Sequence, residues 1–265
     1  MNLSDIMNSN RFRWRIVLVR PRNPLNIGAA ARAMANFGFR DLVVVEPYDP
    51  VWQETRSAVG AEEVISSARA VESLPRALAS DSLAIGTTSG QRRNLDRELI
   101  SLDFLPAWLE HRHPGGKAAL LFGSEKTGLS NQDMSYCHAM VRIPTIARCP
   151  SMNLGQAVAV CCFELASTAR AIVKPEDLRK GEEQAVPGVV SVRAQISAPA
   201  TVGSLDHLFE RAVRVLDQVG YLKPKSRNAT LIKLRRMFLE RGLSSHDAKI
   251  LGGVLAQTEW KLGQS

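Results

Sequence analysis

The sequence predicts an α/β protein with a mostly parallel sheet flanked by helices, followed by a small all-helical domain. Up to about residue 170, short and almost uninterrupted apolar runs of strand length alternate with helix-like segments. A stretch with prolines, glycines and no sustained period then follows over residues 174–203. Beyond it, apolar residues recur at helical three-four spacing. We therefore expect an α/β domain at residues 1–173, a linker at 174–203 and a helical domain at 204–265.

The apolar runs of the first domain define its expected elements. Strands are predicted at residues 15–19, 42–45, 83–87, 118–122 and 139–143. A helix is predicted at residues 26–37, capped by Asn26 and closed by Gly38, and a longer one at 153–173. Ligands in such folds bind beyond the carboxyl ends of the strands. Polar or small residues follow three of these strands, at 86–90, 123–125 and 144–151.

Basic charge is concentrated in the helical tail. The whole chain has a formal net charge of +8 and a pI near 9.6. Residues 204–265 contain eleven Lys and Arg against six Asp and Glu, a net charge of +5. Lys233, Arg235 and Arg236 lie together on the second of the three predicted tail helices. Such a cluster can neutralise phosphates and indicates a nucleic-acid partner, although a solvated polar face is the alternative.

Several classes of protein fit the sequence poorly. No apolar run approaches the roughly 20 residues that span a bilayer, and the N-terminus lacks the apolar core of a secretory signal, so we expect a cytoplasmic protein without a membrane partner. The four cysteines show no Cys-x-x-Cys spacing, which argues against a metal site or a disulfide framework. The run from Gly123 to Ser130 is spaced like a phosphate loop, but Leu129 stands where that loop needs Lys.

Three islands of small and polar residues adjoin the predicted elements, at 26–32, 121–130 and 149–155. Arg32 stands in a run of alanines suited to close helix packing, so its guanidinium either snorkels to solvent or is placed at a ligand. Glu125 either caps local backbone N–H groups or serves the site directly.

The order of these islands resembles the three motifs of the SPOUT (TrmH-type) RNA 2′-O-methyltransferases. The residues that carry the resemblance are Asn26-x-Gly28-x-x-x-Arg32, then Leu121-Phe122-Gly123-x-Glu125-x-x-Gly128-Leu129, then Ile143-Pro144 with Ser151-Met152-Asn153-Leu154. The tail, at residues 228–238 and 250–255, is similar to the C-terminal extension of the TrmJ branch of this family. The resemblance covers nearly the whole chain except the linker.

The resemblance implies a fold, a cofactor and a set of site residues. The fold would contain a deep trefoil knot in the C-terminal part of the α/β domain, and the protein would be a homodimer. S-adenosylmethionine would be the methyl donor, bound by Thr87, Thr88, Ser89, Gly123, Ile143, Pro150, Ser151 and Met152. Arg32, Ser151 and Asn153 would be catalytic. Asn26, Arg32, Glu125, Lys233, Arg235 and Arg236 would contact the RNA.

The implied activity is 2′-O-methylation of the ribose of nucleotide 32 in the tRNA anticodon loop. A guanidinium is a poor base at neutral pH, so we expect Arg32 to stabilise the developing oxyanion. Ser151 and Asn153 are expected to orient the reacting hydroxyl. Two alternatives remain: the same chemistry on ribosomal RNA, and a non-catalytic RNA-binding protein with the same fold.

Overall fold

The computed structural model describes residues 12–48, 52–89, 98–112, 115–172, 198–240 and 242–264. The strands are β1 (Phe12–Val19), β2 (Asp41–Val45), β3 (Arg69–Val71), β4 (Leu83–Thr87), β5 (Leu99–Ser101), β6 (Gly116–Phe122) and β7 (Ala139–Arg142). The helices of the same domain are α2 (Pro24–Asn36), α3 (Glu62–Ser67), α4 (Leu74–Leu78), α5 (Leu105–Arg112), α6 (Asn131–Met134) and α7 (Leu154–Ile172), with a 3-10 turn η1 (Leu102–Phe104). The tail contains α8 (Val202–Gln218), a 3-10 turn η3 (Pro224–Ser226), α9 (Arg227–Glu240) and α10 (Ser245–Leu262).

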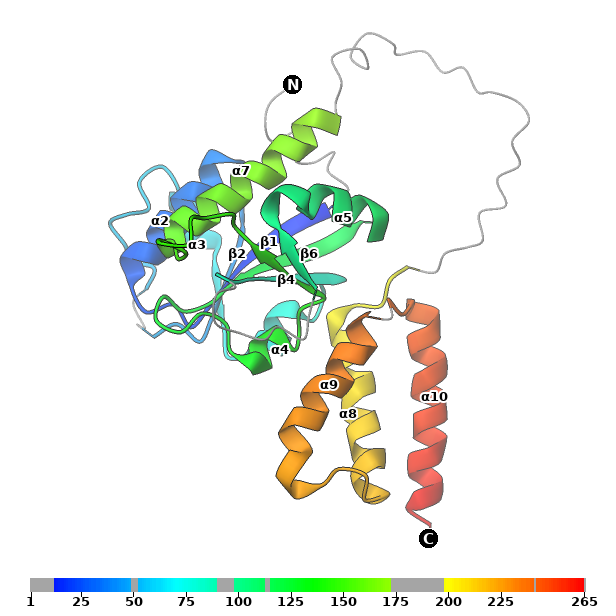
Figure 1. Cartoon of the computed structure of the whole chain (residues 1–265). Coiled ribbons are helices and arrows are strands. Elements are labelled where there is room, and N and C mark those ends of the chain that lie inside the picture. The colour runs from blue at the N-terminus through cyan, green and yellow to red at the C-terminus, as the bar shows by residue number, and fades with distance from the viewer. Residues whose placement is uncertain are drawn as a thin grey trace, which may run out of the picture.

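The seven strands form one sheet in the order β3-β2-β1-β6-β4-β7-β5, and every neighbouring pair is parallel. Successive side chains of a strand point to opposite faces, so Ile16 and Leu18 join the core beneath α2, α5 and α7, whereas Val17 and Val19 join the core beneath α4 and α6. Helices therefore cover both faces (Figure 1). The predicted parallel sheet is confirmed.

The structure adds two strands that the sequence does not predict, β3 and β5. Each is three residues long and lies at an edge of the sheet with a single neighbour. Three residues carry too little periodicity to predict a strand. These strands form because a parallel neighbour, distant in sequence, supplies their hydrogen bonds.

Helix α2 begins earlier than predicted. Asn23, not Asn26, is the N-cap: its side-chain oxygen accepts a hydrogen bond from Leu25 N–H at 2.9 Å, and Pro24 occupies the first helical position. Proline suits that position because its missing N–H has no partner there in any case. The predicted cap at Asn26 is wrong, and the Asn26 side chain is consequently available to the site described below. Gly38 closes the helix as predicted, with φ of 82°.

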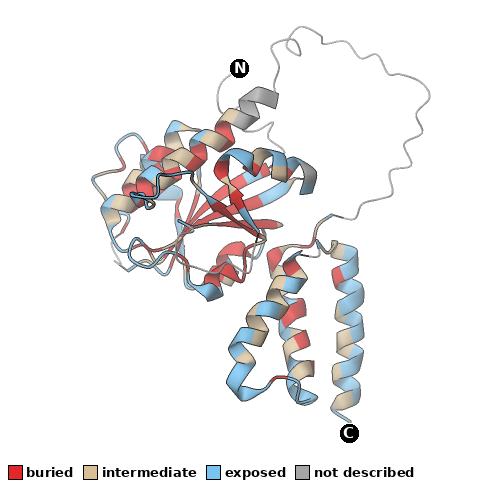
Figure 2. Cartoon of the chain, in the orientation of Figure 1, coloured by how far each residue is buried: buried red, intermediate tan, exposed pale blue. Residues whose placement is uncertain are grey.

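The tail packs around a core of its own. Leu205, Leu208, Leu239 and Ala248 are buried together, and Phe209 meets Phe238 edge to face with ring centroids 6.3 Å apart. Buried residues are sparser there than in the sheet domain (Figure 2). Most of the predicted linker, residues 174–197, lies outside the described residues. The implied trefoil knot stays a prediction, and none of the described helices is long and apolar enough to cross a membrane.

Candidate active site

A cavity of about 750 Å³ lies at the carboxyl edge of the sheet, where β6, β4 and β7 are neighbours. Its walls come from the segments after these three strands and from the start of α7. All eight residues predicted to hold the cofactor line it: Thr87, Thr88, Ser89, Gly123, Ile143, Pro150, Ser151 and Met152. Segments up to 65 residues apart in the chain thus meet at one place, as the shared edge of parallel strands requires.

The turn after β6 forms the tightest part of this wall. A Cβ atom on Gly123 would lie 2.1 Å from the carbonyl carbon of Gly128 and 2.1 Å from the nitrogen of Leu129. The turn closes through a 2.7 Å hydrogen bond from Gly128 N–H to the Ser124 carbonyl, and Gly128 itself has φ of +66°. Glycine at both positions lets the turn fold back on its own strand.

A directional chain of hydrogen bonds runs beside the cavity. Gly155 N–H donates to Asn153 Oδ1 at 2.9 Å, and Asn153 Nδ2 donates to Asn26 Oδ1 at 2.9 Å. Asn26 Nδ2 in turn donates to Glu125 Oε1 at 2.8 Å. Each amide therefore has one orientation, and residues from all three sequence islands are joined in one network.

Glu125 anchors the end of this chain. It also accepts hydrogen bonds from the backbone N–H groups of Arg22, at 2.9 Å, and Asn23, at 3.3 Å. Partial burial by itself raises the pKa of the carboxyl, but the hydrogen bonds from Asn26 and from these backbone groups outweigh burial and hold the pKa below its ordinary value. Glu125 therefore caps local N–H groups and holds Asn26, and it also lines the cavity, so a direct role at the site stays a prediction.

Arg32 lies apart from the cavity wall of its own chain. It is exposed on α2, does not line the cavity, and makes no hydrogen bond or ion pair with any residue that the structure describes. The N-terminus of α7 nevertheless touches the same helix, because a Cβ on Gly155 would lie 2.7 Å from the Cβ of Ala29. Arg32 follows Ala29 by three residues, so it lies one turn further along α2.

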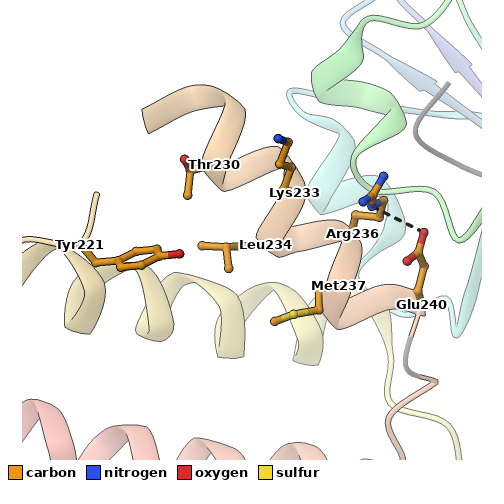
Figure 3. A pocket seen from close by; sticks show the side chains of 7 residues that line it. All are labelled: Tyr221, Thr230, Lys233, Leu234, Arg236, Met237 and Glu240. Atoms are coloured by element: carbon orange, nitrogen blue, oxygen red, sulfur yellow. Dashed lines mark ion pairs between the residues drawn. The ribbon is translucent and has the colours of Figure 1, made fainter. Parts of the chain in front are cut away.

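The basic residues of the tail divide into two groups. Lys233 and Arg236 line a second cavity, of about 620 Å³, together with Tyr221, Leu234 and Met237 (Figure 3). Lys233 is exposed, and Arg236 forms an ion pair with Glu240 at 3.7 Å. Arg235 does not line this cavity, and its guanidinium is instead held between side chains of both domains.

Some residues that line the first cavity are not predicted from the sequence. Lys126, Thr127 and Thr145 line it and lie inside or next to the islands already identified, so position alone could have suggested them. Met134 lines it as well, but no sequence pattern distinguishes this methionine from an ordinary core residue. No group of three His, Cys, Asp or Glu side chains that could hold a metal ion occurs among the described residues.

Two family models match the chain. The model described as the SpoU rRNA Methylase family matches residues 13–163, and the model described as the tRNA methyltransferase TrmJ, C-terminal domain, matches residues 203–265. The chain belongs to the SpoU methylase family. Its tail places it in the TrmJ branch, and it is therefore a methyltransferase.

Individual relatives agree with this assignment. The chain is 32% identical to the tRNA (cytidine/uridine/adenosine-2′-O-)-methyltransferase TrmJ of Pseudomonas aeruginosa, over 93% of this chain and 94% of that protein. It is 34% identical to the tRNA (cytidine/uridine-2′-O-)-methyltransferase TrmJ of Klebsiella pneumoniae, over 92% and 96% of the two chains. Among solved structures, TrmJ from Z. mobilis ZM4 matches with a TM-score of 0.75 and 26% identity, over 92% of this chain and 98% of that one.

Proposed function

We propose that this SpoU-family methyltransferase transfers a methyl group from S-adenosylmethionine to the 2′-hydroxyl of nucleotide 32 in the tRNA anticodon loop. The observation that carries the proposal is the convergence of all eight expected cofactor residues on one cavity. The matching TrmJ C-terminal model and the tRNA-directed names of the relatives favour tRNA over ribosomal RNA.

The cavity suits S-adenosylmethionine in size and chemistry. A volume of about 750 Å³ is in the range of small-molecule sites. Thr87, Thr88 and Ser151 offer hydroxyl groups, while Ile143 and Met152 offer apolar walls for an adenine ring. Gly123 leaves the backbone of its turn open to close approach by a ligand. When bound, the cofactor supplies a methyl group made electrophilic by its sulfonium.

The remaining residues position the hydroxyl and handle its charge. In the transfer, the ribose hydroxyl would lie against the methyl donor held by the cavity, and its proton would pass to solvent. Arg32 does not line the cavity of its own chain, so in the proposed homodimer Arg32 of the partner subunit, as a permanent cation, would stabilise the developing negative charge on the ribose oxygen. Ser151 and Asn153 orient the hydroxyl, and the hydrogen bonds through Asn26 to Glu125 hold Asn153 in place.

The partners follow from the same proposal. Lys233 and Arg236, at the cavity of the tail, neutralise phosphates of the tRNA. The enzyme works in the cytoplasm as a homodimer, in which α2 and α7 are available to a second copy: Leu25 and Phe163 are 53% and 51% exposed on these helices. Sedimentation of the purified protein at micromolar concentration tests this, and a monomer at that concentration contradicts it.

The activity is tested with labelled S-adenosylmethionine and tRNA transcripts, followed by mapping of ribose methylation. A transcript with a single 2′-deoxynucleotide at position 32 is the matched control and should accept no methyl group. Equal labelling of this control, or labelling of ribosomal RNA in preference to tRNA, contradicts the proposal. Calorimetric titration of S-adenosylmethionine separates the enzyme from a non-catalytic RNA-binding protein, which has no need of the cofactor.

A further inference from the structure

Helix α8 of the tail begins on the surface of the sheet domain. The first N–H groups of any helix lack partners within the helix. Here Val202 N–H donates to the Asp81 carbonyl at 2.7 Å, and Gly203 N–H donates to the Ala79 carbonyl at 3.2 Å. Both carbonyls lie just beyond α4, so the sheet domain supplies the partners that the start of the tail helix needs.

Packing at this junction is close and leaves little room for change. A Cβ on Gly203 would lie 2.6 Å from the Ala79 carbonyl oxygen and 3.0 Å from its Cα, both of which are backbone atoms. Val202 is only 2% exposed and belongs to the core of the sheet domain, together with Leu74 and Leu78 of α4. The first turn of the tail is therefore an integral part of the sheet domain's core.

Arg235 forms a second junction, some 30 residues further along the chain. Its guanidinium carbon lies 4.1 Å from the ring centroid of Tyr136 in the sheet domain and 4.3 Å from that of Phe209 on α8. Its NH1 group also pairs with Asp206 of α8. Tyr136 and Phe209 are 7% and 4% exposed. Contacts between a cation and an aromatic ring strengthen when water is excluded, as it is here.

Tyr136 connects this junction to the methyl-donor cavity. It lies two residues after Met134, which ends α6 and lines that cavity. The helix is held by a capping box between Ser130 and Asp133, and Asp133 also pairs with Arg20 just after β1. The tail thus contacts the segment that forms one wall of the cavity.

We propose that the contact of Arg235 with Tyr136 is a fixed joint between the two domains, which sets the position of Lys233 and Arg236 relative to the methyl-donor cavity. Arg235 is then a positioning residue, whereas its neighbours on α9 contact RNA. The part of this inference that concerns RNA rests on the proposed tRNA methylation, but the joint itself does not.

The joint is tested on the protein alone by amide hydrogen exchange at Val202 and Gly203. Arg235→Met keeps an unbranched side chain but removes the cation. We expect about tenfold faster exchange at both amides, with the exchange rates of the β1 amides unchanged. Lys233→Met is the matched control and should exchange as wild type does. Unchanged exchange in Arg235→Met overturns the proposal.

A double-mutant cycle addresses the case in which Arg235→Met unfolds the tail for another reason. Tyr136→Leu should also speed exchange, and the double variant should exchange more slowly than the product of the two single effects, because the contact between Arg235 and Tyr136 is lost in both single variants. If the increase in exchange rate of the double variant equals the product of the two single increases, the two residues act independently, and the proposed joint is contradicted.

Salt dependence of tRNA binding distinguishes positioning from contact with phosphate. Loss of one phosphate contact lowers the slope of log affinity against log salt by about 0.7–0.9, the range between single-stranded and duplex nucleic acid, and we expect this for Lys233→Met. Arg235→Met should keep the wild-type slope and S-adenosylmethionine affinity within about twofold, while kcat/KM on tRNA falls about tenfold. A lowered slope for Arg235→Met assigns it to phosphate contact and overturns the positioning role. Failure of the wild type to bind tRNA defeats the proposed function but leaves the exchange result intact.

Discussion

Gly123→Ala is the substitution that most directly probes how the cavity is built. The added methyl group would lie 2.1 Å from two backbone atoms of the turn, the carbonyl carbon of Gly128 and the nitrogen of Leu129. Neither atom belongs to a flexible side chain, so the turn from Ser124 to Gly128 must open. That opening lengthens or breaks the 2.7 Å hydrogen bond from Gly128 N–H to the Ser124 carbonyl.

The cost can be estimated from these two effects. Overpacking costs about 1–3 kcal/mol and the lost hydrogen bond about 1 kcal/mol, so the free energy of unfolding should fall by about 2–4 kcal/mol. Because residues 124–129 also line the cavity, their displacement should weaken S-adenosylmethionine binding roughly tenfold to hundredfold.

Thermal unfolding and calorimetric titration of the same preparation measure both quantities. Gly253→Ala is the control: nothing lies within 4 Å of its Cβ position on exposed α10, so it should leave cofactor affinity unchanged and gain up to about 1 kcal/mol of stability. If Gly123→Ala folds and binds the cofactor as the wild type does, the geometry assigned to this turn is wrong.

Three further changes test other parts of the site and the core. Arg32→Ala should lower kcat by about 10²–10³-fold while calorimetry shows unchanged cofactor affinity, and a near-wild-type rate contradicts its role at the oxyanion. Asn153→Ala removes the bonds to Asn26 and to Gly155 N–H, so chemical denaturation should show a loss of about 1–3 kcal/mol, with kcat reduced; unchanged stability would mean that the chain to Glu125 is not formed in solution. Burial raises the pKa of Asp81 to about 6 despite its pairing with Arg15. Its ordinary value near 3.9 lies below this, so the native state binds the proton more tightly and Asp81 costs stability progressively from about pH 4 to pH 6. The stability of Asp81→Asn relative to wild type should consequently rise by about 2 kcal/mol between pH 4 and pH 7 in denaturation series, and a pH-independent difference contradicts this.

Much of the sheet could be predicted because its strands are buried on both faces. Residues 16–19 of β1 are fully enclosed, and an uninterrupted apolar run is the direct consequence of such burial. The short edge strands β3 and β5 carry no such run, because an edge strand has one neighbour and partial exposure. The cofactor cavity could be predicted for a related reason: small residues after parallel strands gather at one edge whatever the details of the connections.

The roles of Asn26 and Arg235 could not be predicted in the same way. Asn26 was expected to cap its own helix, since a polar residue before a helical pattern usually does, but Pro24 moves the helix start and Asn26 joins Glu125 and Asn153 instead. These partners lie 99 and 127 residues away, beyond any local pattern.

Arg235 shows the same division between sequence and structure. The amino-acid sequence alone establishes that Arg235 is a cation on a basic amphipathic helix, near Lys233 and Arg236, because charge and helical period are local properties. Which of the three cations faces solvent and which lies against Tyr136 depends on how α8 packs against α4 and α9 against α8, and this is decided only when distant segments exclude water from one another.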